Sequence, residues 1–319
     1  MGMEKRTLGR SGIEVTALGL GCMRISGPSQ FIDGTKGEWS GIPDTKGKIR
    51  CLHTAMDKGV TLFDTSMAYG CGENEETLGK AFSDRRDKVI IATKFGNLMD
   101  EASRTLMRRK GGPFLAKAGT FPDWIRWSCE QSLRRLRTDY IDLYQCHAGM
   151  ADNGEEMMET LERLVQEGKI RWYGWSTDDA DRVRTFAQGE HCAAAELALN
   201  VLRSTNEALE VCEESNLAAL IRSPLGGGLL AKSEQDIKQT EANIEKMKEL
   251  DAIREILTSE GRSVVQGAIC WLWARSDVTV PIPGFRTMEQ LEGLCGALQF
   301  GPLTQEQMAE IETIQNEIP

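Results

Sequence analysis

The sequence predicts a (β/α)8 barrel with an N-terminal β-hairpin and an extra C-terminal helix. Short runs of β-branched and other apolar residues alternate with amphipathic helical stretches along the whole chain. Eight such strand-then-helix units follow one another without a break in composition, and eight units close as a parallel barrel with helices outside. A doubly wound sheet is disfavoured because "GLGCMR" carries only two glycines of the usual three. We therefore expect residues 1–319 to form a single barrel domain.

The expected elements follow from local pattern. The barrel strands are expected at 15–23, 60–66, 88–96, 140–149, 170–176, 193–200, 217–225 and 278–284. The helices that the periodicity delimits are 49–59, 73–82, 122–137, 155–169, 263–276, 287–298 and 303–318. Gly59 ends the first of these, and Pro122 lies in the first turn of the third. The segment "KRTLGRSGIEVTAL" (5–18), with its Gly-Arg-Ser-Gly turn, predicts a hairpin that could plug the N-terminal end of the barrel.

Composition excludes several classes of function. A net charge of −10 argues against nonspecific binding to nucleic acid or to anionic membranes. No apolar run approaches the ~20 residues of a membrane helix, and the N-terminus lacks an apolar signal region. The nine cysteines are odd in number and form no C-x-x-C pair, so reduced thiols and a cytoplasmic location are expected.

Polar residues fall where the expected strands end, which is where an α/β barrel carries its chemistry. Asp64 and Tyr69 follow the second strand, and Lys94 lies at the end of the third. Buried lysines are rare unless paired, and Asp64 on the neighbouring strand is the natural partner. One interpretation is a buried ion pair that only ties two strands together.

The functional interpretation adds Tyr69 and His147, which closes the fourth strand. A nearby ammonium lowers the pKa of a phenol, which can then exchange a proton with a substrate oxygen. His147 could hold that oxygen by a hydrogen bond. The alternative is that His147 is a core histidine with satisfied hydrogen bonds.

Several segments resemble the aldo-keto reductases. "FDTSMAYG", "IIATKFG" and "DYIDLYQCH" match motifs of that family in order and in strand context. "LGRSGIEVTALGLGCM", "EGKIRWYGWS", "RSPLGGGLL" and "IPGFRTMEQL" match it too, so the resemblance covers almost the whole chain. It implies a catalytic tetrad of Asp64, Tyr69, Lys94 and His147, and a nicotinamide cofactor extended across the barrel mouth. The 4-pro-R hydride would pass to a carbonyl carbon while Tyr69 protonates the oxygen.

The resemblance also implies residues that bind the cofactor, expected to be NADP(H), and it implies no metal. These residues are Gly21, Cys22, Met23, Asp64, Ser176, Thr177, Glu196, Arg222, Ser223, Pro224, Leu225, Gly227, Pro283, Gly284, Phe285, Arg286 and Gln290. Ser176 takes the place that bonds the nicotinamide carboxamide, and the backbone of "PLGGGLL" approaches the pyrophosphate. Arg286 opens a helix, where an anion is favoured. It could bind the 2′-phosphate, or it could only cap a solvated helix.

Five positions depart from the family pattern. Thr177 stands where Asn is usual, and Glu196 where Gln is common, so that its carboxylate could accept from the carboxamide NH2. Arg222 replaces a frequent stacking Tyr, and its guanidinium could stack or reach the pyrophosphate. Gly293 and Leu294 replace a Glu-Asn pair that grips the adenine.

Substrate selection is assigned to two long loops, 27–49 and 97–122. The second is locally basic, with cations at Arg104, Arg108, Arg109 and Lys110. It could bind an anionic substrate or be a solvated charged loop.

The leading functional hypothesis is an NADP(H)-dependent oxidoreductase that reduces an aldehyde or ketone, including a sugar-derived one. One alternative is a redox-neutral sugar-modifying enzyme, an epimerase or lyase, that retains its cofactor. Another is a regulatory subunit that senses cofactor. The partner is expected to be a small carbonyl or alcohol substrate, with neither nucleic acid nor membrane involved.

Overall fold

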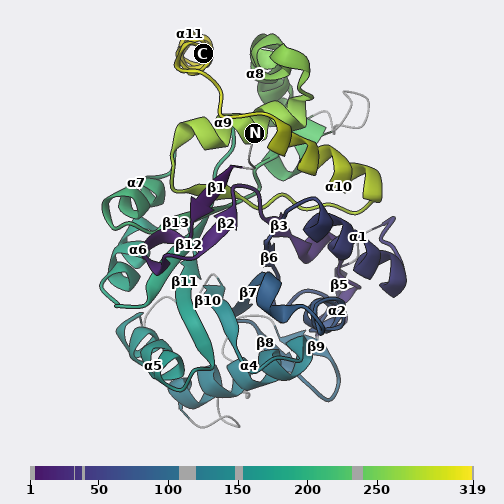
Figure 1. The fold of residues 1–319 in the computed structure, drawn as a ribbon, viewed down its shortest axis with the longest axis vertical. Coiled ribbons are helices and arrows are strands. Elements are labelled where there is room, and N and C mark those ends of the chain that lie inside the picture. The colour runs from purple at the N-terminus through teal and green to yellow at the C-terminus, as the bar shows by residue number, and fades with distance from the viewer. Residues whose placement is uncertain are drawn as a thin grey trace.

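The computed structural model describes residues 4–31, 33–37, 40–107, 120–147, 154–231 and 240–317, and a parallel eight-stranded sheet lies at its centre (Figure 1). In spatial order the strands are β3 (Leu20–Gly21), β6 (Leu62–Asp64), β7 (Ile90–Phe95), β10 (Ile141–His147), β11 (Ile170–Ser176), β12 (Cys192–Ala198), β13 (Ala218–Arg222) and β14 (Thr279–Pro281). The two ends of the sheet meet, because the N–H groups of Gly19 and Gly21 donate to the carbonyls of Pro281 and Pro283 at 2.9 and 3.1 Å. The predicted barrel is confirmed.

Helices surround the sheet (Figure 1). They are α1 (Thr45–Asp57), α2 (Glu73–Ala81), α4 (Phe121–Leu136), α5 (Gly154–Gln166), α6 (Ala180–Ala187), α7 (Glu207–Glu214), α8 (Glu241–Thr258), α9 (Val264–Arg275), α10 (Met288–Cys295) and α11 (Gln305–Glu317). Helix α1 begins four residues before its predicted start because the Asp44 side chain accepts from the N–H of Gly47 and caps the helix there. The expected C-terminal helix is α11, where Gln315 donates to the Val201 carbonyl.

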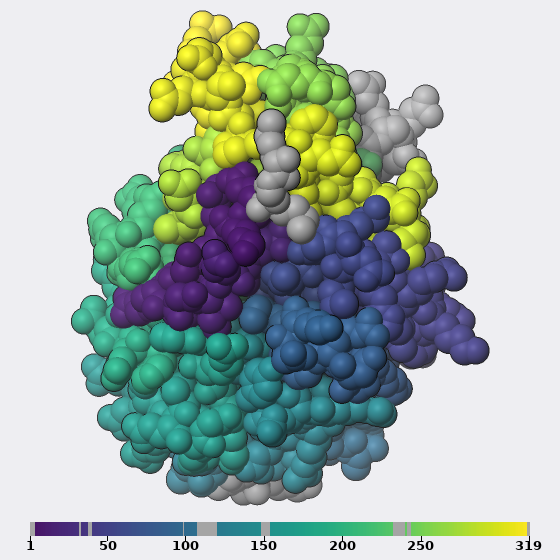
Figure 2. Space-filling model, viewed as in Figure 1, coloured from purple at the N-terminus to yellow at the C-terminus, as the bar shows by residue number. Residues whose placement is uncertain are grey.

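The N-terminal hairpin closes one end of the barrel, as the sequence predicts. Strands β1 (Lys5–Thr7) and β2 (Glu14–Thr16) pair antiparallel. Leu8 and Val15, from this hairpin, are buried in one cluster with inward-facing residues of the barrel strands. A Cβ on Gly9 would lie 2.3 Å from the Ala193 carbonyl oxygen, so only glycine permits this close approach. In Figure 2 the N-terminal residues (purple) cover the middle of the face toward the viewer.

The expected strand 15–23 is wrong as a single element. Val15 and Thr16 belong to the hairpin, whereas Leu20 and Gly21 pair with β6 in the barrel. The chain bends between them, and a Cβ on Gly19 would lie 2.9 Å from the Ile282 side chain. One apolar run thus contributes strands to two sheets. The hydrophobicity of this run does not indicate that the chain bends within it.

The two long loops lie side by side. The first contains the two-stranded ribbon β4 (Ser29–Gln30) and β5 (Lys36–Gly37), and the second contains β8 (Leu98–Asp100) and β9 (Thr105–Met107). A bridge between Phe31 and Leu106 joins them. In the second loop Arg104 pairs with Glu76 of α2 at 2.9 Å, while Arg108, Arg109 and Lys110 lie outside the described residues.

The described helices include none with the length and apolar character that crossing a membrane requires. All nine cysteines lie in the described part of the chain as buried free thiols.

Candidate active site

A layer of polar side chains lies above an apolar layer inside the barrel. Side chains two apart on a strand share a face, so each inward-facing apolar residue is followed by a polar one nearer the C-terminal end of its strand. The pairs are Leu62 and Asp64 on β6, Ala92 and Lys94 on β7, Leu143 and Gln145 on β10, and Ala194 and Glu196 on β12. The apolar members belong to the cluster that the hairpin caps. In the described strands, these four polar side chains therefore all lie toward the C-terminal end of the barrel.

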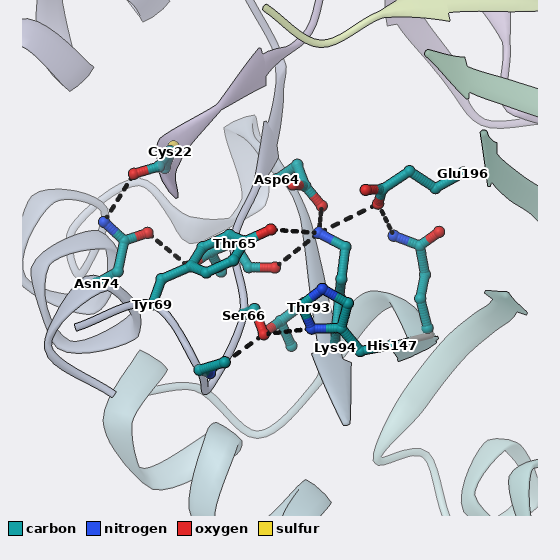
Figure 3. A network of polar contacts seen from close by, with 12 residues as sticks. Cys22, Asp64, Thr65, Ser66, Tyr69, Asn74, Thr93, Lys94, His147 and Glu196 are labelled. Atoms are coloured by element: carbon teal, nitrogen blue, oxygen red, sulfur yellow. Dashed lines mark hydrogen bonds and ion pairs between the residues drawn. The ribbon is translucent and has the colours of Figure 1, made fainter. Parts of the chain in front are cut away.

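Lys94 is the centre of this layer (Figure 3). Its ammonium contacts Asp64 Oδ1, and it lies 3.1 Å from both Glu196 Oε2 and the Thr65 carbonyl oxygen. The side chain is fully buried, and Asp64 and Glu196 are 2% and 3% exposed. Burial lowers the pKa of the lysine, but the carboxylates more than offset it, so that its pKa lies well above the ordinary value. The predicted pairing of Lys94 with Asp64 is present, and Glu196 is a second partner.

Tyr69 lies in the loop after β6 and directs its hydroxyl to Lys94, with 3.4 Å between Oη and Nζ. Asn74 fixes this loop, since its amide oxygen accepts from the Thr65 hydroxyl at 2.6 Å and its NH2 donates to the Cys22 carbonyl at 3.1 Å. Burial raises the pKa of the Tyr69 phenol above its ordinary value, and the lowering effect of Lys94 does not compensate. The expected net lowering of this pKa is wrong, because burial and the two carboxylates outweigh one ammonium.

His147 faces Tyr69 from the end of β10, and the two rings meet edge to face with centroids 6.0 Å apart. Its Nδ1 lies 2.8 Å from the Asn97 amide nitrogen and 3.2 Å from the Ser66 hydroxyl. An amide NH2 can only donate, so Nδ1 is an acceptor and the ring proton lies on Nε2. The imidazole can therefore donate a hydrogen bond from Nε2.

The expected carboxamide site lies at the ends of β11 and β12. Ser176 and Thr177 are buried, and Ser176 pairs in register with both His147 and Glu196. The Thr177 hydroxyl accepts from the N–H of Asp179, the residue whose side chain caps α6. Glu196, which is expected to accept from the carboxamide, contacts Lys94 through Oε2 and accepts there from the Gln145 amide at 3.0 Å.

Arg222 is paired with a carboxylate that the sequence analysis did not single out. Its guanidinium donates to Asp178 Oδ2 at 2.6 Å. Asp178 Oδ1 in turn accepts from the N–H of Ala198 at 2.7 Å and from Asn206 at 3.1 Å. These bonds join the loops that follow three neighbouring strands.

The expected pyrophosphate loop after β13 has an open backbone. Ser223, Gly226, Gly227 and Gly228 all have positive φ, and a Cβ on Gly227 or Gly228 would meet nothing within 4 Å. Pro224 and Leu225 are buried, and the Leu225 side chain packs in the main core. A ligand over this loop would meet backbone rather than these side chains.

Two arginines, Arg24 after β3 and Arg286 after β14, lie near Gly284. The Arg24 side chain passes over Gly284, where a Cβ would lie 2.9 Å from its Cγ. Burial, and then the charge of Arg286, lower the pKa of Arg24. Arg286 donates to the Ser40 carbonyl at 3.2 Å, and its own N–H donates to the Gln290 side chain at 2.9 Å.

The remaining expected cofactor residues are distributed around these groups. Gly21 and Gly284 form the bridge that closes the barrel, Cys22 and Met23 begin the short 3-10 turn after β3, and Pro283 and Phe285 are buried. The Phe285 side chain and that of Leu294 lie in the main core.

Sequence reasoning missed Gln145, Asn97, Asn74, Asp178 and Arg24. A signal existed for Gln145, since it stands two residues before His147 on the same strand and must share its inward face. The others lie in loops or on the first turn of a helix, where side-chain direction has no fixed period.

A closed parallel barrel with a buried ammonium, a phenol and an imidazole at the C-terminal ends of its strands defines an α/β-barrel protein with a candidate active site in the usual place. A family model described as "Aldo/keto reductase family" matches residues 17–316, and the chain belongs to this family of oxidoreductases.

Individual relatives span nearly the whole chain. The uncharacterized oxidoreductase YqkF of Bacillus subtilis (strain 168) is 30% identical over 324 residues, which cover 98% of this chain and 96% of that protein. Aldo-keto reductase yakc [NADP(+)] of Schizosaccharomyces pombe is 29% identical, with 94% and 88% covered. Among solved structures, glycerol dehydrogenase AKR11B4 from Gluconobacter oxydans is similar with a TM-score of 0.82 and 26% identity, with 100% and 97% covered.

Proposed function

We propose that this protein is an NADP(H)-dependent carbonyl reductase in which Tyr69 is the general acid. The observation that carries the proposal is the contact of the Tyr69 hydroxyl with the buried Lys94 ammonium, beside an imidazole. A raised phenol pKa keeps Tyr69 protonated at neutral pH, which is the state that a proton donor needs.

The residues around the barrel mouth fit a dinucleotide phosphate. The two neighbouring guanidinium groups of Arg24 and Arg286 supply positive charge for a phosphate at the start of α10, a helix N-terminus. The open glycine backbone at Gly227 and Gly228 allows close approach of a second anionic group. Ser176 would hold the carboxamide. A relative whose name specifies NADP(+) supports the same cofactor here.

When bound, a reduced nicotinamide supplies a hydride to the carbonyl carbon of the substrate. Tyr69 then gives its phenolic proton to the substrate oxygen, which completes the alcohol and leaves a phenolate that solvent reprotonates. Lys94 stabilises that phenolate by its charge. His147 donates from Nε2 to the same oxygen and orients it.

The substrate is proposed to be a small aldehyde or ketone, and the polyol dehydrogenase among the structural relatives favours one derived from a sugar or polyol. The cytoplasm is the proposed location, in keeping with nine buried free thiols.

The test is NADPH oxidation at steady state across a panel of aldehydes and ketones, sugars included. We expect turnover in the wild type and at least a ~10²-fold loss of kcat in Tyr69→Phe, in line with general acid catalysis. Tyr140→Phe, away from the barrel mouth beside Arg86, is the matched control. Retained cofactor without net NADPH consumption would instead support the redox-neutral alternative, and cofactor binding without turnover the sensing one.

A further inference from the structure

The most unusual feature of the site is its second carboxylate. Asp64 from β6 and Glu196 from β12 both contact the Lys94 ammonium (Figure 3). All three groups are at most 3% exposed. One cation and two carboxylates leave an excess negative charge when all are ionised, and a buried excess charge is costly.

The position of Glu196 is fixed by the protein. The Gln145 amide donates to Oε2, the same oxygen that contacts Lys94, and Gln145 is the register partner of Lys94 on the adjacent strand. The backbone carbonyl of Glu196 accepts from the N–H of Thr177 at 2.9 Å. Glu196 is thus built into the lysine site in this structure.

We propose that Glu196 is a positioning residue of the proton donor: together with Asp64 it holds Lys94 beside the Tyr69 hydroxyl and adds a second negative charge there, which favours carbonyl reduction over alcohol oxidation. This inference rests on the proposed function.

The physical argument concerns charge beside the phenol. Reduction uses the protonated phenol, and oxidation of an alcohol needs the phenolate as a base. Lys94 favours the phenolate, whereas each nearby carboxylate disfavours it, and Asp64 and Glu196 both raise the pKa of Tyr69. Replacing Glu196 by a neutral amide of the same shape would remove one of these two charges.

Other titratable groups face the cluster. The Cys22 thiol, from the turn after β3, has a pKa raised mainly by burial, so it stays neutral. His147, from β10, faces Tyr69 edge to face. The Asp64 carboxyl has its pKa raised to about 8, first by burial and then by the charge of Glu196. The second carboxylate therefore affects the protonation of Asp64 as well as that of Tyr69.

The first experiment compares pH profiles of wild type and Glu196→Gln. We expect the high-pH limb of kcat/KM for carbonyl reduction, and the onset of alcohol oxidation, to move down by about one pH unit in the variant. Glu162→Gln, which removes a carboxylate that binds His191 on the outside of the barrel, should keep the wild-type profile. If the high-pH limb is unchanged and only the KM for the cofactor increases, the proposal is overturned, and Glu196 is instead assigned to binding of the carboxamide.

A second variant covers the case in which Glu196→Gln folds poorly. Gln145→Leu removes the amide that donates to Glu196 Oε2 and so allows the carboxylate to move away from Lys94. The high-pH limb of kcat/KM should then also move to lower pH, by a smaller amount than in Glu196→Gln. No movement in this variant contradicts the proposal.

The cofactor-free protein gives a readout that does not depend on turnover. Asp64 has a folded pKa of about 8, above its unfolded value, so its contribution to stability is lost as pH rises from about 4 through 8. In Glu196→Gln this loss should shrink, and at pH 9 the variant should melt above the wild type. Equal melting curves across this pH range refute the two-carboxylate cluster. A fully active Tyr69→Phe instead refutes the proposed function, and with it the role of Glu196 toward the proton donor, while the cluster itself stands.

Discussion

Replacing Lys94 by Met tests the charge balance of the site most directly. The substitution deletes the only ammonium that contacts Asp64 and Glu196 in the described structure, while the linear side chain still fills the space. Removing one partner of a buried ion pair typically destabilises a protein by about 3–5 kcal/mol. For a chain of this size about 2 °C of melting temperature corresponds to each kcal/mol, so we expect a loss of roughly 6–10 °C at pH 8.

The loss should depend on pH with a definite sign. Without the ammonium, the pKa of Asp64 rises further above its unfolded value, so the folded state binds more protons than the unfolded state. The contribution of Asp64 to stability is then present at low pH and lost as pH increases. The melting temperature of Lys94→Met, followed by differential scanning fluorimetry, should therefore lie closest to wild type at pH 5 and farthest at pH 8 to 9.

Combined variants distinguish charge from packing. Lys94→Met with Asp64→Asn leaves Glu196 buried and unpaired, so it should recover only part of the stability. Adding Glu196→Gln removes every charge of the cluster and should recover most of the rest, without recovering activity. A single variant as stable as the wild type at pH 8 would show that the lysine is hydrated, and the reasoning would fail.

Three further predictions concern the general acid, the binding of the cofactor and the stability of the fold. Tyr69→Phe should retain NADPH affinity while kcat falls at least ~10²-fold, measured by fluorescence titration and by initial rates. Arg286→Ala should raise the Kd for NADPH roughly tenfold to a hundredfold and leave NADH nearly unchanged, and higher salt should weaken NADPH binding more in the wild type. Leu8→Ala, at the fully buried hairpin plug, should lower the free energy of unfolding by about 2–5 kcal/mol in urea denaturation.

Matched controls make each of these outcomes decisive. Tyr140→Phe should keep wild-type turnover. Arg254→Ala removes an exposed guanidinium that binds Asp251 on α8, and it should leave both cofactor affinities unchanged. Ile244→Ala removes an exposed apolar side chain and should change stability by no more than about 0.5 kcal/mol. Equal losses for both cofactors in Arg286→Ala would show that this residue only caps α10.

The sequence by itself determined the barrel and the end of it that carries the polar groups. Alternation with period two and the order of strands and helices are local properties, so they can be predicted directly from the sequence. They place Asp64 and Lys94 at adjacent strand ends and the imidazole of His147 nearby, and the structure has them there. The N-terminal hairpin could be predicted for the same reason, because its short turn and the apolar residues on both sides are local features of the sequence.

Only the tertiary structure decided which charges meet. Glu196 contacts Lys94 although its strand lies about a hundred residues later in the chain. Arg222 forms an ion pair with Asp178, which lies in another loop. These contacts depend on how the strands are staggered and how the barrel closes, which no local pattern encodes. The same closure divides the run 15–23 between two sheets, because Gly21 must pair with β6 while Val15 fills the barrel end. The net pKa direction of Tyr69 follows from burial and from both carboxylates, so it too could be read only after folding had brought them together.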